Sequence, residues 1–162
     1  MTHNLGCDWD YKSNWFGASK ADPRVAYLFS HHYSSRKGGK TIRDWQRAGI
    51  TANGESMTLI TPDACALFVW LRQNKRDDGE VGVNCAVFRN EAPGLYLSSD
   101  LILEAEQLAW DRWPGERLFT FVDGREVSGD GACFKHAGWR KLNRRTKHGL
   151  IILEKYPTEA QL

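Results

Sequence analysis

The chain has 162 residues, of which 41% are hydrophobic and 26% are charged. This composition predicts a globular protein, and the lack of an apolar run long enough to cross a bilayer excludes a membrane-spanning chain. The net charge of +2 is too small to indicate nucleic-acid binding by itself, so the distribution of charge matters more than its total.

The length predicts one domain over residues 1–162, with an aromatic and polar segment at 1–55 and a core of sheet and helices at 56–155. The first residues show no apolar leader, which predicts a protein of the cytoplasm with reduced thiols. The four cysteines are scattered singly along the chain, so a structural zinc site is not expected.

The first regular element expected is a short helix at 40–49, because the rest of the N-terminal segment shows no clear periodicity. Two apolar runs follow, at 64–71 and 81–89, and the residues between them include an Asp-Gly turn. The two runs predict an antiparallel hairpin.

A long helix is predicted at 98–113, where apolar residues recur at helical spacing. Ser98 or Ser99 would cap its N-terminus, and Pro114 would end it. The remaining predicted elements are a strand at 117–124, a short helix at 131–139 and a strand at 149–154.

The order of these elements predicts an α/β fold, with a mixed central sheet and flanking helices. Its central strands would run parallel around the helix at 98–113. Sheets of this kind place ligands at the carboxyl ends of their strands. This predicts a site at the loop 88–99, with the sequence FRNEAPGLYLSS.

A cluster of titratable and hydroxyl side chains stands at 31–35, with the sequence HHYSS. Imidazoles and phenols exchange protons, and imidazoles also bind metal ions. The catalytic candidates here are His32, Tyr33 and Ser34, and the candidate metal ligands are His31 and His32. The alternative interpretation is a polar loop with incidental histidines.

Three further catalytic candidates lie in the predicted site loop. A carboxylate such as Glu91, beside Asn90, is suited to accept a proton from an attacking amine. Its alternative role is to bond nearby N–H groups of the loop. Ser99 has an alternative role as a helix cap, as does Ser98.

Cations gather in two stretches of the sequence. The first, at 135–152, has no acid, and the second, at 36–47, has five cations and one acid. Such stretches indicate phosphate contacts, and a neighbouring tryptophan can stack on a displaced base. The alternative is a solvated strand edge. The nucleic-acid-binding candidates are Arg36, Lys37, Lys135, Trp139, Arg140, Lys141, Arg144, Arg145 and Lys147.

Residues 58–154 resemble the second half of a GNAT acyltransferase, with a strand, a loop, a long helix, a strand and a short helix that ends in AGW. The resemblance implies an acyl donor such as acetyl-CoA, whose pyrophosphate would sit on a glycine-rich loop before the long helix. Here that loop, NEAPGLYLSSDL, has a single glycine and departs from the pattern. A tyrosine of the short helix often protonates the leaving thiolate in such enzymes, whereas Phe134 beside Cys133 cannot.

The segments SHHYSS and FRNEAPGLYLSSDL are similar to elements of the phage Mom proteins. These GNAT-like enzymes convert adenine in DNA to its N6-carbamoylmethyl form and lack the usual CoA loop. The resemblance implies a DNA-modifying transferase of the host-cell cytoplasm, in which His32, Tyr33, Asn90, Glu91 and Ser99 orient the donor and the amine. It leaves the identity of the donor and the presence of a metal open.

DNA and a small-molecule group donor are therefore the expected partners. Two other functions are consistent with the same residues. One is an acyl-CoA-dependent N-acetyltransferase that acts on a small amine or a protein. The other is a non-catalytic nucleic-acid-binding module on a decayed transferase fold.

Overall fold

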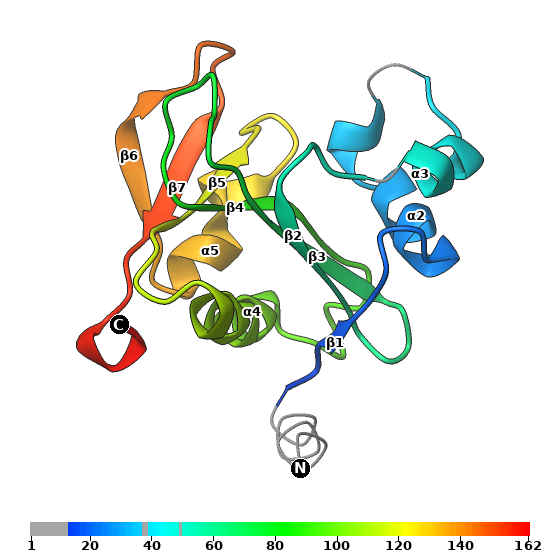
Figure 1. Ribbon diagram of the computed structural model, residues 1–162, viewed down its shortest axis with the longest axis horizontal. Helices are drawn as coiled ribbons and strands as arrows, with labels where there is room; N and C mark the ends of the chain where they lie inside the picture. Colours follow the sequence, from blue (N-terminus) through cyan, green and yellow to red (C-terminus); the bar gives the residue numbers. More distant parts are fainter. Residues whose placement is uncertain (1–12, 37–38, 49) are drawn as a thin grey trace.

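The computed structural model describes residues 13–36, 39–48 and 50–162. It shows a seven-stranded mixed sheet with the strand order β1-β2-β3-β4-β5-β7-β6 and helices against it (Figure 1). The predicted α/β class is confirmed, and the arrangement is consistent with a GNAT-like domain. Cys7 and Lys37 lie outside the described residues.

The first four strands are antiparallel neighbours in chain order. They are β1 (Phe16–Gly17), β2 (Glu55–Ile60), β3 (Ala66–Arg72) and β4 (Val83–Asn90). The predicted hairpin is confirmed, since Phe68 of β3 stands opposite Phe88 of β4. The sequence did not predict β2 or the helix α2 (Pro23–Ser30), which begins at Asp22 through a side-chain cap on the N–H of Arg24.

Helix α4 (Ser98–Arg112) carries the chain from β4 to β5 (Leu118–Val122), and these two strands run parallel as predicted. They pair over Val83–Cys85 and Leu118–Thr120 only. The short helix α5 (Ala132–His136) follows, and then β6 (Arg140–Arg145) and β7 (Ile151–Lys155), which are antiparallel to each other. Three 3₁₀ turns complete the elements: η1 (Tyr33–Arg36), η2 (Ser128–Asp130) and η3 (Glu159–Gln161).

Two apolar clusters cover the two faces of the sheet. Alternate residues of β3 serve both, because successive side chains of a strand point to opposite faces. Phe68 and Trp70 pack in the cluster of α4 and α5, whereas Leu67 and Val69 pack in the cluster of α2. The helix α3 (Ile42–Ala48) lies beside α2, as Figure 1 shows. Burial on both faces explains why β3 is a continuous apolar run.

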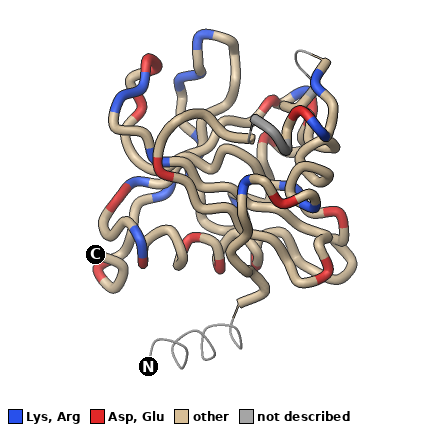
Figure 2. Tube along the Cα trace, turned by 45° about the vertical axis from the view of Figure 1, so that its right-hand side comes forward, with Lys and Arg blue, Asp and Glu red and all other residues tan. Residues whose placement is uncertain are grey.

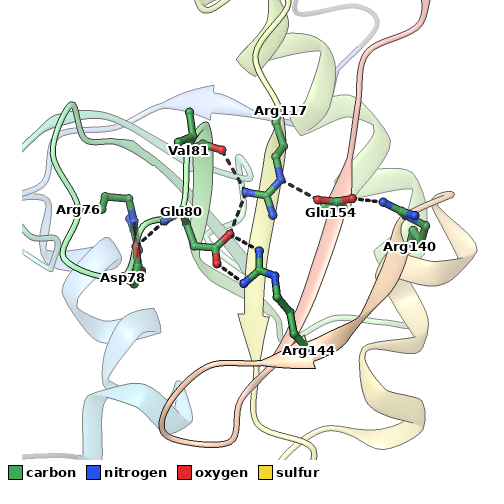
Figure 3. A network of polar contacts seen from close by, with 8 residues as sticks. All are labelled: Arg76, Asp78, Glu80, Val81, Arg117, Arg140, Arg144 and Glu154. Atoms are coloured by element: carbon green, nitrogen blue, oxygen red, sulfur yellow. Dashed lines mark hydrogen bonds and ion pairs between the residues drawn. The ribbon is translucent and has the colours of Figure 1, made fainter.

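Buried ion pairs join β5, β6 and β7 to the loop before β4 (Figure 3). Arg117 bonds Glu80 at 3.1 Å and Glu154 at 2.7 Å, and both carboxylate side chains are only 6% exposed. Arg144 adds a second arginine to Glu80, at 2.6 and 3.0 Å, and Arg140 adds a second to Glu154. Each buried carboxylate is thereby compensated by two arginines, which offsets its desolvation.

We expect Gly82→Ala to destabilise the fold by more than about 3 kcal/mol. A Cβ at this position would lie 2.2 Å from the carbonyl oxygen of Arg117, and the glycine has φ +127°. Gly79→Ala is the control, because Gly79 also has a positive φ, +75°, but open space around its Cβ position. The control should cost about 1 to 2 kcal/mol in urea unfolding. Equal losses in the two variants would show that backbone conformation, and not the contact with Arg117, constrains Gly82.

The stability of the protein should fall as the pH drops below the ordinary carboxyl range. Hydrogen bonds from Arg144 hold the pKa of Glu80 below its ordinary value. A lowered pKa in the folded state adds stability above the unfolded pKa, and this is lost as the pH falls through the folded pKa. Urea unfolding at about pH 7 and about pH 4 should show a smaller difference in Glu80→Gln than in the wild type. The exposed Asp111→Asn, which removes the same charge, should keep the wild-type difference.

Candidate functional site

A cavity of about 610 Å³ opens where β4 and β5 separate. The hydroxyl of Thr120 donates to the carbonyl oxygen of Cys85 at 2.9 Å, at the last paired position of the two strands. Beyond this link, Val87 and Phe88 of β4 and Phe121 and Val122 of β5 line the cavity. The cavity therefore occupies the carboxyl ends of the parallel pair, where the fold predicts a ligand.

Three other segments close the cavity. His32, Tyr33 and Ser34 reach it from the turn after α2, and Ser98 and Ser99 from the N-terminus of α4. The third segment runs from Asp123 to α5. The structure thus brings together four of the six predicted catalytic residues: His32, Tyr33, Ser34 and Ser99.

His32 is held in one tautomer. Its Nδ1 accepts the backbone N–H of Ser34 at 3.2 Å and lies 2.7 Å from the Ser34 hydroxyl. A nitrogen that accepts carries no proton, so the neutral ring has its proton on Nε2. The ring stacks on Tyr33, with centroids 4.4 Å apart, and His32 is 9% exposed. This is a fixed imidazole rather than a loop side chain in solvent.

Tyr33 is suited to donate a proton. Its hydroxyl oxygen accepts the backbone N–H of Asp123 over a long 3.5 Å. Burial is the main cause that raises the pKa of Tyr33 above its ordinary value. The phenol therefore stays protonated at neutral pH, so it has a proton to donate.

The N-terminus of α4 presents donors to the cavity. Leu97 occupies the capping position and has no side-chain acceptor, so it leaves the first-turn N–H groups of Ser98 and Ser99 uncapped. The Ser98 hydroxyl oxygen accepts the Asn90 amide at 3.0 Å, which leaves the Ser98 O–H as a donor. Uncapped N–H groups at a helix N-terminus favour a negatively charged ligand or an oxyanion.

Asn90 lies beside the cavity, in a smaller hollow of about 230 Å³ that also includes His32 and Tyr33. Its amide donates to the carbonyl oxygen of Tyr96 at 2.8 Å, and its oxygen accepts the N–H of Ala92 at 3.0 Å. These bonds shape the loop that enters α4. The observed contacts of Asn90 are therefore structural.

Glu91 does not line the cavity. Its carboxylate bonds His31 at 2.6 Å and Arg89 at 2.7 Å. Partial burial opposes ionisation, but these hydrogen bonds outweigh it and hold the pKa of Glu91 below its ordinary value. The carboxylate is thus a weak base away from the cavity, which is closer to the alternative interpretation of a bonded loop residue.

The predicted metal ligands have different partners, because His31 bonds Glu91 and His32 bonds Ser34. Within residues 13–36, 39–48 and 50–162, no three His, Cys, Asp or Glu side chains lie close enough together to bind a metal ion. The geometry of His31 and His32 does not support a shared metal.

Sequence reasoning missed several cavity residues, among them Thr120, Asp123, Ser128 and His136. Cys133 also lines the cavity, and burial raises the pKa of its thiol. The position of Thr120 and Asp123 near the end of a predicted central strand was a usable signal. Only the folded chain brings Ser128 and His136 to the same place.

The prediction that Trp139 stacks on a base is wrong. Trp139 is 4% exposed and packs in the core cluster of α4 and α5, and its indole N–H donates to Glu106 at 2.7 Å. Trp113, which follows the last residue of α4, is 7% exposed and donates to Glu55 at 2.8 Å. Both indoles are structural.

The predicted cationic residues divide into two groups. Arg140, Lys141 and Arg144 form ion pairs with Glu154, Asp130 and Glu80, so acids distant in sequence offset part of their charge. The residues that remain exposed without such a pair in the described part of the chain are Lys135, Arg145 and Lys147. Arg36 ends η1, with its side chain outside the description. Figure 2 shows positive and negative residues interspersed along the trace.

A comparison with known protein families finds no family that matches this chain, and a comparison with curated proteins finds no similar sequence. None of the helices in the described residues is long and apolar enough to cross a membrane.

Replacing His32 should cost stability, because the ring is buried and bonded. We expect His32→Ala to destabilise the protein by about 2 to 3 kcal/mol, since it opens a cavity and leaves the Ser34 N–H without its acceptor. His32→Asn can place an oxygen near the position of Nδ1 and should recover about half of the loss. Thermal melting of the two variants tests this. A melting temperature of His32→Ala equal to that of the wild type would contradict the observed packing.

Proposed function

We propose that this chain is a transferase that moves a small acyl or carbamoylmethyl group to the exocyclic amine of a nucleic-acid base. A GNAT-like enzyme resembling the phage Mom proteins, with adenine in DNA as the substrate, fits the proposal best. One observation carries it: the His32-Tyr33-Ser34 turn meets the N-terminus of α4 and the diverging ends of β4 and β5 in a single cavity.

The cavity residues supply the groups that such a transfer needs. The amine nitrogen attacks the carbon of the group that is transferred, which is the carbonyl carbon of an acyl group or the methylene carbon of a carbamoylmethyl group. The bond from that carbon to the leaving group breaks, and the amine loses a proton. The Ser34 hydroxyl can accept that proton while it passes its own proton to Nδ1 of His32, 2.7 Å away. Tyr33, protonated at neutral pH, gives a proton to the leaving group. The protons therefore balance, because Ser34 and His32 together accept one proton and Tyr33 donates one.

The developing negative charge also has partners. With an acyl donor the carbonyl oxygen gains charge as the amine attacks, and with either donor the leaving group gains charge. Donors fixed in advance stabilise such charge most strongly. The uncapped first turn of α4 and the Ser99 hydroxyl lie on the cavity and are suited to this role. Phe134 also lines the cavity but has no group to donate, so Tyr33 takes the place of the acid.

A nucleic-acid substrate is supported by the surroundings of the cavity. The turn that carries His32 and Tyr33 ends at Arg36, and the following described residues include the exposed Lys40 and Arg43. An amine inside a base stack is out of reach of a cavity, so the base would have to be turned out of the helix. The cations that follow this turn in sequence would hold the phosphates while the base is turned out.

An acyl-CoA-dependent N-acetyltransferase is the second candidate, favoured by one observation. The N-terminus of α4 is uncapped where it meets the cavity, and such a terminus can bind a pyrophosphate. Against it, the loop before α4 has the single glycine Gly94, beside Pro93, so few backbone N–H groups can converge on a phosphate. Calorimetric titration with acetyl-CoA separates the candidates, because the first predicts little binding.

The proposal is tested by expressing the protein in bacteria, digesting the cellular DNA and weighing its nucleosides by mass spectrometry. We expect a new adenine nucleoside, and we expect Tyr33→Phe to reduce its yield by about 100-fold or more, because the variant has lost the acid. Tyr27→Phe is the matched control: Tyr27 lies on the same α2–η1 segment, 50% exposed, and is not part of the cavity.

The possible outcomes separate the candidates. DNA that is unmodified although the protein binds it would favour the non-catalytic module. Unmodified DNA together with tight acetyl-CoA binding would favour the N-acetyltransferase. Full modification by Tyr33→Phe would remove the acid role from Tyr33.

A further inference from the structure

A second concave surface lies on the other side of β5 from α4. It is a groove of about 590 Å³ between the loop at 73–80 and the turn that joins β6 to β7. In Figure 1 the green loop before β4 and the orange turn after β6 lie next to each other above the sheet. We call this surface the loop–hairpin groove.

The walls of the loop–hairpin groove are rich in cations. Arg76 and Arg144 are held in place, because Arg76 pairs with Asp78 at 2.7 Å and Arg144 pairs with Glu80 at 2.6 Å. Arg76 also lies over the Phe119 ring, 5.1 Å from its centroid. In each of these two ion pairs the acid cancels most of the charge of the arginine, and the pair fixes the position of the arginine in the wall.

Three more cations on the walls are exposed and form no ion pair in the described part of the chain: Lys75, Arg145 and Lys147. The one acid of the groove outside the two ion pairs above is Asp77. The exposed His148 adds a further donor. The groove therefore has an excess of positive charge on exposed side chains, next to two arginines that ion pairs hold in place. This arrangement suits a row of phosphates.

The groove is continuous with the cavity between β4 and β5. Phe121 and Leu150 line both. A hollow of about 440 Å³ between them is lined by Asp123, which it shares with the cavity, and by Arg145, which it shares with the groove. The groove, the hollow and the cavity therefore adjoin one another, so a chain molecule bound at the cations would lie next to the cavity.

We infer that the loop–hairpin groove binds the phosphodiester backbone of the nucleic-acid strand whose base enters the cavity. The inference rests on the proposed function, and it goes beyond it by naming the path of the substrate. Lys75 and Lys147 contact phosphates, and Phe121 offers an aromatic side chain to the base next to the modified one. Arg140 and Lys141, which the sequence placed among the binding residues, take no part, because they lie outside the groove in ion pairs of their own.

The test measures binding alone, with a short fluorescent single-stranded oligodeoxynucleotide and its duplex as probes. We expect the double variant Lys75→Glu, Lys147→Glu to bind about tenfold or more weakly at low salt. The slope of log K against log salt should fall by about 1.4 for the single strand, because two phosphate contacts are lost. Lys20→Glu is the control, since Lys20 is exposed near β1, at the opposite end of the sheet from β6.

Folding is checked by melting, and Lys75→Gln with Lys147→Gln provides a gentler pair of changes that should lose less affinity than the reversal. The inference is overturned if the reversal leaves oligonucleotide affinity unchanged, or if Lys20→Glu weakens binding equally. It is also overturned if the reversal abolishes binding of acetyl-CoA but not of the oligonucleotide, because the groove would then hold the phosphates of a donor.

Failure of this inference can be told from failure of the proposed function. The binding assay needs neither donor nor chemistry, so it reports on the groove alone. Normal binding of the oligonucleotide together with unmodified cellular DNA would contradict the proposed transfer reaction alone. Normal modification of DNA by the variant with both lysines reversed would contradict the role of the groove alone.

Discussion

The short parallel pairing of β4 with β5 is the constraint from which the rest of the site follows. At one end, the N–H of Val83 donates to the carbonyl oxygen of Arg117 at 2.8 Å, beside Gly82, where a side chain would collide with that oxygen. At the other end, Thr120 bonds Cys85. Between these points the strands are in register, and past them they diverge. An open space between two strands of one sheet is costly unless other elements line it, and here the turn after α2 and the helices α4 and α5 do so.

The buried carboxylates on the other side of β5 stabilise the same parallel pairing. Arg117 directly precedes β5 and faces Gly82, and its guanidinium joins Glu80 to Glu154. Glu80 belongs to the loop before β4, and Glu154 belongs to β7. The ion pairs therefore tie the beginning of the parallel pair to the edge of the sheet. They also fix Arg144, which forms one wall of the loop–hairpin groove.

Much of the fold could be predicted because its signals are local. The apolar runs predicted β3 and β4 correctly, and the helical periodicity predicted α4. The rule for crossover connections then predicted that β5 runs parallel to β4. Helix α2 was missed although Asp22 and Pro23 form a start signal, because the segment before it shows no periodicity. Strand β6 was not predicted, since RKLNRR has no apolar alternation; it is a strand because β7 pairs with it and distant acids accept its arginines.

The candidate site divides in the same way. HHYSS was visible as a cluster because its residues are adjacent in sequence, and the structure keeps His32, Tyr33 and Ser34 on one cavity. Thr120 and Cys133 join them only through the fold. The cationic stretch was misleading for a related reason: a sequence shows the sign of a charge but not its partner, and Glu80 is 64 residues from Arg144. Trp139 was misjudged because its neighbours in sequence are exposed while its own ring is in the core.

Helix α4 has an optical consequence. The indole of Trp15 donates to the carbonyl oxygen of Leu101 at 2.8 Å, and that of Trp70 to the carbonyl oxygen of Ala105 at 2.9 Å. Trp110 lies on the helix itself, and Trp139 bonds its Glu106 side chain. Tryptophans dominate the near-ultraviolet fluorescence of a protein, and most of those in this chain therefore lie on or against one helix. The intrinsic fluorescence of this protein reports chiefly on whether α4 packs against the sheet. Binding of a molecule at the first turn of α4 can therefore be detected without a label.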